Sequence, residues 1–543
     1  MAFVVAMALA VALALALVQL TEGVFPWQEP PTSFRNKCLA YRPENSIDEA
    51  TRTELAFIPA GTNLTLVDND ASCNRPNQVV GTDLCRVSLH IPTSTRSGIV
   101  YELWLPETWN GRLVTTGNGG IDGCIKYEDL AYTSANGFAA VGTNNGHNGT
   151  SGIQFLNNED VVVDFAWRAL HTGVEAGKTL AKLFYGSTVS KSYYIGCSLG
   201  GRQGIKGAEK FPGDFDGIVA GAPAVDFNNL YSWRASFFVI TGPESSPGFI
   251  EPDVWKMVIH DEVLRQCDLI DGVADGIIED PSLCEFDPEA LQCDSTGKTD
   301  ECLTPAQVDI VRKVFSPLRW SEGTLLFPGM NPGSEMKTAD GLYDGQPWPM
   351  SEGWFRYAVY NDPDWNPTNF TVKDAAIADI KDPGGIRTWP SSLARFQDRG
   401  GKLLVFHGQQ DNQITSFNTP RFYDHLSQGM GYSPAQMDDF FRFFRVSGMF
   451  HCNSGPGAWV LGQGGNAAAE GVPFDADHNV LAAVVDWVEK GVAPDTMTGT
   501  KFVNDTVSLG VDFKRRHCKW PSRNTYLGDG RNPKNPDSWD CKG

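Results

Sequence analysis

Positively charged residues are scarce in this sequence. Its 543 residues include 44 Lys and Arg against 65 Asp and Glu, which gives a formal net charge of −21. Nucleic acids and anionic membranes repel such a chain, so neither is expected as a partner. Hydrophobic residues make up 41% and charged residues 20% of the sequence. This balance is typical of a folded globular protein rather than a disordered one.

Long hydrophobic runs are absent beyond the N-terminus. Residues 1 to about 21 are dominated by Ala, Val, Leu and Met and carry no charge before Glu22. This run predicts a signal peptide over residues 1–22, and therefore a secreted, extracellular protein. It lacks a basic residue after Met1, and it is just about long enough to span a bilayer, so a membrane anchor is the alternative.

The sequence has no C-x-x-C pair, which argues against zinc or thioredoxin chemistry. An even number of cysteines in a secreted chain predicts six disulfides. Local spacing favours two pairs, Cys267 with Cys284 and Cys293 with Cys302, and leaves the others open. Four N-x-[ST] sequons are candidate glycosylation sites in a secreted protein; they are Asn63, Asn148, Asn369 and Asn504.

The segment 191–204, KSYYIGCSLGGRQG, is the centre of the functional interpretation. Residues 192–195 are aromatic and β-branched and predict a buried strand, and a helix is expected after the glycines. A serine between glycines at a strand-to-helix turn is the nucleophile elbow of α/β-hydrolases. Ser198 is therefore the candidate nucleophile.

Strands and helices alternate around this segment, which points to a largely parallel sheet and an α/β-hydrolase core. An N-terminal β-rich edge is expected over residues 25–100. The strand predicted at residues 111–116 runs into a glycine cluster, where Gly119 or Gly120 could supply an oxyanion-binding N–H beside that of Leu199. Further elements are predicted as strands at 85–91, 101–106, 138–143, 216–221, 403–406 and 441–446, and as a helix at 165–185.

The alternation breaks down over residues 223–392, which are rich in Pro, Trp and Asp. We interpret them as an inserted lid domain, with residues 25–222 and 393–543 forming the catalytic domain. The Trp and Phe side chains of this segment are expected to form a flat apolar pocket for a substrate ring. The tail from about residue 504, with Cys518 and Cys541, is expected to be a disulfide-clamped terminal segment.

Two further residues complete a candidate triad. Asp411 follows the predicted strand 403–406, at the sheet edge where α/β enzymes assemble their sites. His451 lies in a loop after the strand 441–446, where it can act as general base on Ser198 while Asp411 orients it. The order Ser, Asp, His is that of α/β-hydrolases. Rival candidates are Asp438, Asp439, Asp475 and Asp477 for the acid and His407 and His478 for the base.

Two cysteines flank these candidate residues. Cys197 immediately precedes Ser198, and Cys452 immediately follows His451. A bond between them would fasten the nucleophile to the base. The alternative is that each cysteine pairs elsewhere.

In these residues the chain resembles the fungal tannase and feruloyl esterase family, including feruloyl esterase B-like members. The sharpest parts of the resemblance are residues 196–204, 407–411 and 451–452, and it covers nearly all of the mature chain. It implies an α/β-hydrolase core with a lid, a Cys197–Cys452 disulfide, and hydrolysis of phenolic acid esters through an acyl-enzyme. It also implies the pairs Cys38–Cys85, Cys73–Cys124, Cys267–Cys284, Cys293–Cys302 and Cys518–Cys541.

The resemblance extends to a structural calcium site in the segment 268–277, DLIDGVADGI. Alternating carboxylates and backbone carbonyls in a glycine-kinked loop suit a hard cation that takes six to eight oxygens. The implied ligands are Asp268, Asp271, Val273, Asp275 and Ile277. An acidic turn without metal is the alternative.

Together with the sequence features, the resemblance implies a secreted serine esterase that hydrolyses feruloyl esters of plant cell-wall polysaccharides, with a role in xylan degradation. Its expected partner is a small phenolic ester or a feruloylated polysaccharide. One alternative is a tannase acting on galloyl esters. Another is a catalytically silent secreted binding protein on a hydrolase scaffold.

Overall fold

The computed structural model describes residues 33–294, 302–464 and 471–543. The predicted signal peptide, residues 1–22, lies outside these ranges. The chain divides into two compact units, residues 1–41 and 42–543. The described part of the first unit is α2 (Phe34–Ala40), which begins after Ser33, whose hydroxyl accepts a hydrogen bond from the N–H of Asn36. No helix in the described ranges is long and apolar enough to cross a membrane.

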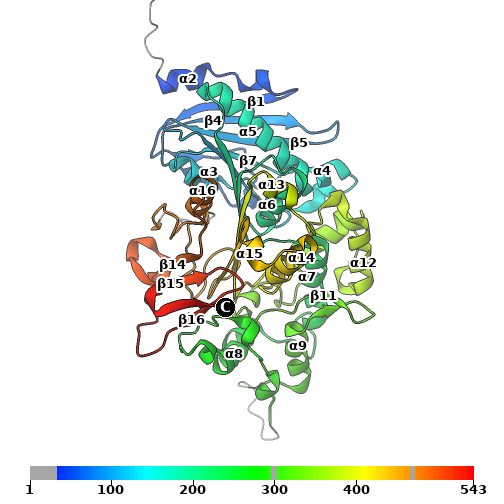
Figure 1. Cartoon of the computed structure of the whole chain (residues 1–543). Coiled ribbons are helices and arrows are strands. Elements are labelled where there is room, and N and C mark those ends of the chain that lie inside the picture. Colours follow the sequence, from blue (N-terminus) through cyan, green and yellow to red (C-terminus); the bar gives the residue numbers. More distant parts are fainter. Residues whose placement is uncertain (1–32, 295–301, 465–470) are drawn as a thin grey trace, which may run out of the picture. The chain divides into compact units, whose positions relative to one another are not determined.

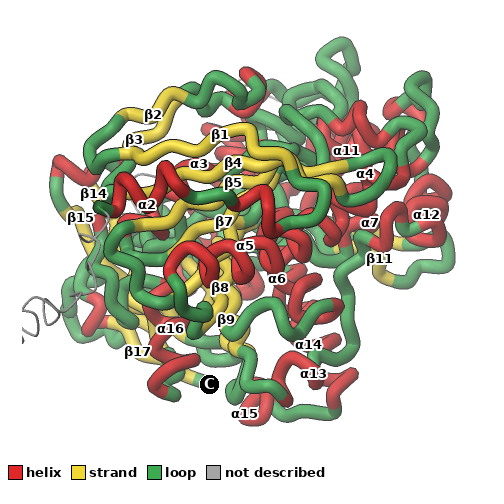
Figure 2. Tube along the Cα trace, turned by 90° about the horizontal axis from the view of Figure 1, so that it is seen from above, coloured by secondary structure: helices red, strands yellow, loops and turns green. Residues whose placement is uncertain are grey.

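The second unit is built on a mixed sheet (Figures 1 and 2), whose strand order in the described residues is β1-β4-β5-β7-β6-β8-β9-β12-β13. The pairs from β1 to β7 are antiparallel, and those from β7 to β13 are parallel. The strands are β1 (Thr51–Ile58), β4 (Leu84–Pro92), β5 (Gly98–Pro106), β6 (Arg112–Thr116), β7 (Ala139–Thr143), β8 (Lys191–Cys197), β9 (Gly217–Gly221), β12 (Lys402–Gly408) and β13 (Phe441–Val446). The predicted strands and the largely parallel sheet are confirmed.

Both faces of the parallel strands are buried, because helices cover each of them. Alternate residues of one strand enter different hydrophobic clusters: Tyr193 and Ile195 of β8 pack in one and Tyr194 in the other. One cluster contains α3 (Tyr127–Ala135) and α16 (Val480–Lys490), and the other contains α5 (Ala169–Tyr185), α6 (Leu199–Lys210) and α14 (Asn418–Met430). The predicted helix at 165–185 is α5, preceded by a π-helical turn over Asp164–Arg168.

Residues 223–392 contribute no strand to this sheet in their described part. Their aromatic side chains instead build a separate hydrophobic cluster around α7, together with residues from outside the segment such as Phe165 in the π-helical turn and Leu199 in α6. The elements are α7 (Phe227–Thr241), α8 (His260–Cys267), α9 (Pro305–Phe315), β10 (Leu318–Arg319), β11 (Leu325–Phe327), α10 (Glu335–Thr338), α11 (Pro349–Gly353) and α12 (Val372–Lys381). The interpretation of this inserted segment as a lid remains a prediction.

The C-terminal tail forms two hairpins beyond the sheet. One pairs β14 (Thr496–Phe502) with β15 (Val511–Cys518), and the other pairs β16 (Arg523–Tyr526) with β17 (Trp539–Lys542). The Cys518–Cys541 disulfide joins β15 to β17. The remaining short elements are β2 (Asn63–Thr65), β3 (Asn77–Val79), α4 (Glu159–Val163), α13 (Ala394–Asp398) and α15 (Pro434–Met437).

Candidate active site

Ser198 lies in the sharp turn between β8 and α6. Its backbone has φ 65° and ψ −122°, a conformation that non-glycine residues rarely adopt and that recurs at functional sites. Its glycine neighbours are required by close packing: a Cβ on Gly196 would lie 2.6 Å from the hydroxyl of Tyr194, and one on Gly201 would lie 2.3 Å from the carbonyl oxygen of Gly221. The turn therefore presents the Ser198 hydroxyl at the carboxyl end of β8, as a nucleophile elbow does.

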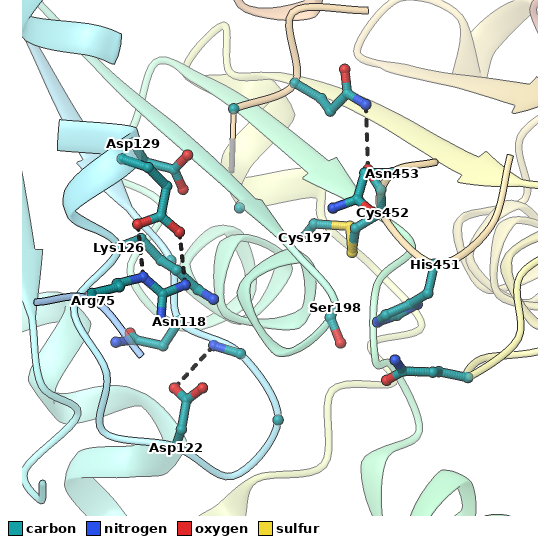
Figure 3. Close-up of a pocket in the computed structure, with 18 of the residues that line it drawn as sticks. Arg75, Asn118, Asp122, Lys126, Asp129, Cys197, Ser198, His451, Cys452 and Asn453 are labelled. Carbon is teal, nitrogen blue, oxygen red and sulfur yellow. Dashed lines mark hydrogen bonds and ion pairs between the residues drawn. A yellow bond between two sulfur atoms is a disulfide. The ribbon is translucent and has the colours of Figure 1, made fainter. Parts of the chain in front are cut away.

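Asp411 and His451 form a hydrogen-bonded pair beyond the ends of β12 and β13. The Nδ1–H of His451 donates to Oδ2 of Asp411 at 2.8 Å, and the backbone N–H groups of Gln413 and Ile414 donate to Oδ1, each at 2.8 Å. A neutral imidazole that donates from Nδ1 has Nε2 as its acceptor. His451 and Ser198 line the same cavity (Figure 3), so this acceptor is available for the serine proton.

Asp411 is contacted by a second histidine. His407, fully buried in β12, directs Nε2 toward Oδ2 of Asp411 at 3.1 Å and toward the carbonyl oxygen of Ile414 at 3.1 Å. Because both partners are acceptors, Nε2 must carry the proton, and Nδ1 accepts from the Thr419 hydroxyl at 2.6 Å. His407 is thus oriented to support the acid and has no access to the cavity.

The electrostatic surroundings keep Asp411 ionised. Burial alone would raise the pKa of this carboxyl group, but the charge and hydrogen bond of His451, together with the hydrogen bond of His407, hold its pKa well below the usual range. An ionised Asp411 stabilises the imidazolium that forms when His451 accepts a proton. The rival base His478 pairs instead with Asp475 at a site that does not line this cavity.

The Cys197–Cys452 disulfide joins the elbow to the histidine loop. It links residues 255 apart in sequence, with their Cα atoms 6.0 Å apart. Cys452 has φ 65°, so the backbone turns immediately after His451. Four more predicted pairs are present, Cys73–Cys124, Cys267–Cys284, Cys293–Cys302 and Cys518–Cys541. The pairing of Cys38 with Cys85 remains a prediction.

Gly119 and Gly120, the two candidates for the second oxyanion donor, differ in what their backbone N–H groups already bind. The N–H of Gly119 donates to Oδ1 of Asp122 at 3.3 Å. The N–H of Gly120 and that of Leu199, the first residue of α6, have no acceptor among the described residues. Leu199 follows Ser198 in the chain and Gly120 lines the same cavity as Ser198, so this pair is the better placed to bind a developing oxyanion.

Two residues that the sequence interpretation missed hold the oxyanion loop in place. Gln203 of α6 accepts the N–H of Asn118 at 3.0 Å. The Tyr231 hydroxyl of α7 donates to the carbonyl oxygen of Gly120 at 3.0 Å. Gln203 belongs to the motif 196–204 that carried the family resemblance, whereas no local pattern distinguishes Tyr231.

The cavity at Ser198 has a volume of about 360 Å³ and is lined by polar side chains, glycines, Met350 and the Cys197–Cys452 disulfide. The expected flat apolar pocket of Trp and Phe side chains is wrong for this cavity, because none of them lines it in the described part of the chain. Several of them pack in a hydrophobic cluster instead and are at most 1% exposed, namely Trp233, Phe237, Trp255, Trp354 and Phe355. Among the described residues of the inserted segment, Met350 alone lines the cavity.

The predicted calcium loop lies between the disulfide-bonded Cys267 and Cys284. Asp271 accepts the N–H of Val273 on Oδ1, while its Oδ2 is buried without a hydrogen-bond partner, and burial raises its pKa to about 7. Asp268 accepts the N–H of Gly276, and Asp275 pairs with Arg515 at 2.6 Å. No group of three or more His, Cys, Asp or Glu side chains converges as a metal site in the described residues.

The four sequon asparagines are all exposed on the surface. Asn63 begins β2, Asn369 ends a 3-10 turn, and Asn504 lies in a turn after β14. Asn148 follows the buried loop that carries Asn145 and His147.

A mixed sheet of this order, with the elbow after β8, the acid after β12 and the histidine after β13, defines an α/β-hydrolase fold. The sequence model of the family described as "Tannase and feruloyl esterase" matches residues 85–541. The chain belongs to this family and is a carboxylic ester hydrolase.

Individual relatives agree with this assignment. The chain is 58% identical over 489 residues to a probable feruloyl esterase B-2 from Aspergillus flavus, covering 90% of this chain and 94% of that protein. It is similar to the crystal structure of feruloyl esterase B from Aspergillus oryzae, with a TM-score of 0.90, 44% identity, and coverage of 94% and 100% of the two chains. A tannin acyl hydrolase from Aspergillus niger shares the fold at 20% identity, with a TM-score of 0.73 and coverage of 94% and 96%.

Proposed function

We propose that this protein is a secreted feruloyl esterase that releases hydroxycinnamic acids from plant cell-wall polysaccharides such as xylan. The single observation that carries the proposal is the placement of Ser198 and the Asp411–His451 pair around one cavity. The A. flavus relative named as a probable feruloyl esterase supports the acyl group. The disulfides and the four exposed sequons support secretion and glycosylation.

In this mechanism His451 Nε2 removes the proton of Ser198 as the hydroxyl attacks the ester carbonyl. The N–H groups of Leu199 and Gly120 bind the oxyanion, and Asp411 stabilises the imidazolium. His451 then gives its proton to the departing alcohol oxygen. A water molecule, activated by the same imidazole, hydrolyses the acyl-enzyme and releases the aromatic acid.

Ser198→Ala tests this proposal. The variant should lose on the order of 10⁴-fold or more in kcat on methyl ferulate, because among the described residues no other hydroxyl or free thiol group lines the cavity. The wild-type protein should be labelled by a fluorophosphonate probe and the variant should not. An unlabelled wild-type protein would instead favour the silent binding protein.

Initial rates on methyl ferulate and methyl gallate separate the feruloyl esterase from the tannase. The similarity to the A. niger tannin acyl hydrolase is limited to the fold, at 20% identity. We therefore expect the higher kcat/KM on methyl ferulate. A higher kcat/KM on methyl gallate would reverse the assignment of the acyl group.

We also propose that the loop 268–277 holds a structural calcium ion. The partnerless Oδ2 of Asp271 supports this, since a buried carboxylate oxygen needs a cation or a donor. Asp268, Asp271 and Asp275 would supply carboxylates, and Val273 and Ile277 backbone carbonyls. Chelation should lower the melting temperature and added Ca²⁺ should restore it, whereas Asp271→Asn should abolish this response. A melting temperature that is insensitive to Ca²⁺ would support the metal-free turn.

A further inference from the structure

One wall of the cavity carries no aromatic or aliphatic side chain. Asn453, which Figure 3 shows beside Cys452, lies apart from this wall. The wall is formed by the described residues Arg75, Lys126, Glu128 and Asp129, which come from two separate parts of the chain. We call this set the polar wall. Burying an apolar ring against these groups would cost the hydration of charges and gain little contact, so the polar wall does not suit the aromatic acid.

The Arg75–Glu128 pair gives the wall a fixed geometry. Nε and Nη2 of Arg75 donate to the two carboxylate oxygens of Glu128, each at 2.7 Å, and Nη1 donates to the carbonyl oxygen of Cys73 at 2.9 Å. The Cys73–Cys124 disulfide ties the loop that carries Arg75 to the segment that leads into α3. A bidentate pair anchored in this way is already held in one orientation before a ligand binds. Binding therefore costs little additional side-chain entropy.

Lys126 supplies unused donors. It lies just before α3, and its Nζ is 3.4 Å from the position that a Cβ on Gly119 would occupy, beside the oxyanion loop. This ammonium group forms no hydrogen bond or ion pair with any described residue, although it lines the cavity. Its three N–H donors can therefore bind a ligand.

The charge of the wall selects between anionic and neutral ligands. Arg75 and Lys126 face the carboxyl groups of Glu128, Asp129 and the adjacent Asp122, which also lines the cavity. Burial raises the pKa of Asp122. The acidic groups at least balance the two cations, so an anion gains little attraction here. A neutral ligand with several hydroxyl groups can use both donors and acceptors.

The polarity of the wall decides which half of the ester meets it. The departing alcohol oxygen takes its proton from His451, which lines the same cavity as the wall. The charged groups of the wall can form hydrogen bonds with hydroxyl groups of the alcohol half, whereas an aromatic ring would gain little from them. We propose that the polar wall is a subsite for the alcohol half of the substrate, and that it binds a neutral, polyhydroxylated sugar. This inference rests on the proposed esterase function.

Lys126→Met tests the subsite, because it removes the ammonium group and keeps the aliphatic stem. Two esters are compared: methyl ferulate, and ferulate esterified to the primary hydroxyl of arabinose. The ratio of kcat/KM on the sugar ester to kcat/KM on the methyl ester should fall about tenfold, as expected for the loss of charged hydrogen bonds to a ligand. Lys126→Arg should restore most of the ratio. The matched control is Lys182→Met, an exposed lysine of α5, which should leave the ratio unchanged.

Two outcomes would overturn the proposal. Equal losses of kcat/KM on both esters would show that Lys126 acts on the oxyanion loop rather than on the alcohol. A larger loss on the quinic acid ester of ferulate, whose alcohol half carries a carboxylate, would identify an anion site. A wild-type protein that hydrolyses neither ferulate ester would contradict the proposed function itself, which is a different result from either of these.

Discussion

Two regions of the molecule differ in which side chains face the cavity. These regions are the carboxyl ends of the parallel strands and the inserted segment 223–392. At the strand ends, polar groups face the cavity: Ser198 and His451 line it, and Asp411 lies directly behind His451. In the inserted segment, large aromatic residues such as Trp233 and Trp354 are buried against one another and do not reach the cavity. Reaction chemistry is therefore concentrated at the sheet, whereas the inserted segment acts on the site through a few contacts.

The contacts from the inserted segment are specific. Tyr231 of α7 donates to the carbonyl oxygen of Gly120 in the oxyanion loop, and Arg234, one turn later, donates to the carbonyl oxygen of Gln413 beside Asp411. One helix thus supports both the oxyanion loop and the loop of the triad acid. If this comparison is correct, changes at the strand ends should reduce catalysis more than changes in α7.

Among variants that leave the triad residues unchanged, the largest effect is expected from Cys197→Ser combined with Cys452→Ser. Without the disulfide, the loop after β13 is no longer fastened to the elbow, and His451 moves relative to Ser198. A displacement of about 1 Å at a reacting group costs on the order of 100-fold in rate. We expect a loss of this size in kcat on methyl ferulate, with a smaller change in KM.

The control for this variant is Cys518→Ser combined with Cys541→Ser, which removes a disulfide from the C-terminal hairpins. Both double variants should unfold at lower temperature, since each loses a cross-link. Only the first should lose kcat at a temperature where both are folded. Equal kcat values would show that the Cys197–Cys452 bond stabilises the fold without positioning His451.

The order of the elements was readable from the sequence because it follows from local patterns. Residues 193–195 and 403–406 are short apolar runs with a glycine within two residues, and they became part of the buried strands β8 and β12. Ser198 and Asp411 could then be placed at strand ends. The substrate side of the cavity could not be read in this way.

The substrate side of the cavity could not be predicted from the sequence for a physical reason. Composition shows that residues 223–392 are rich in Trp, but burial of Trp354 or its exposure in a pocket depends on contacts with residues distant in sequence, such as Phe155 and Phe165. Arg75 reaches the cavity only because a disulfide and a carboxylate from α3 hold its loop there. The local periodicity of hydrophobic residues does not reveal such long-range contacts.

An intermediate effect is expected from His407→Phe, which removes the second donor to Asp411 while keeping a ring of similar size. A hydrogen bond to a charged group contributes about 1.5–3 kcal/mol, and we expect kcat to fall about tenfold. Asp411 should become more basic, because His407 is one of the groups that lower its pKa. A more basic Asp411 binds the protonated His451 more strongly, so the acidic limb of the kcat/KM profile should move to higher pH.

His407→Gln is the matched variant, because its amide N–H can occupy the position of Nε2. His407→Gln should return the acidic limb of the kcat/KM profile to its wild-type pH and restore most of kcat. The charge of Arg234, which interacts with that of Asp411, is unchanged in both variants. A lower melting temperature with an unmoved acidic limb in His407→Phe would assign His407 to packing alone.

The smallest effect is expected from Tyr231→Phe. The change removes the hydroxyl that donates to the carbonyl oxygen of Gly120 and leaves the ring stacked on Phe227. A neutral hydrogen bond contributes about 1 kcal/mol, so kcat should fall about fivefold as the Gly120 N–H loses its fixed orientation toward the oxyanion. KM should change little, because this donor acts mainly in the transition state. If kcat instead falls as far as in the Cys197/Cys452 double variant, α7 contributes to catalysis as much as the strand ends do, and the division between the two regions is wrong.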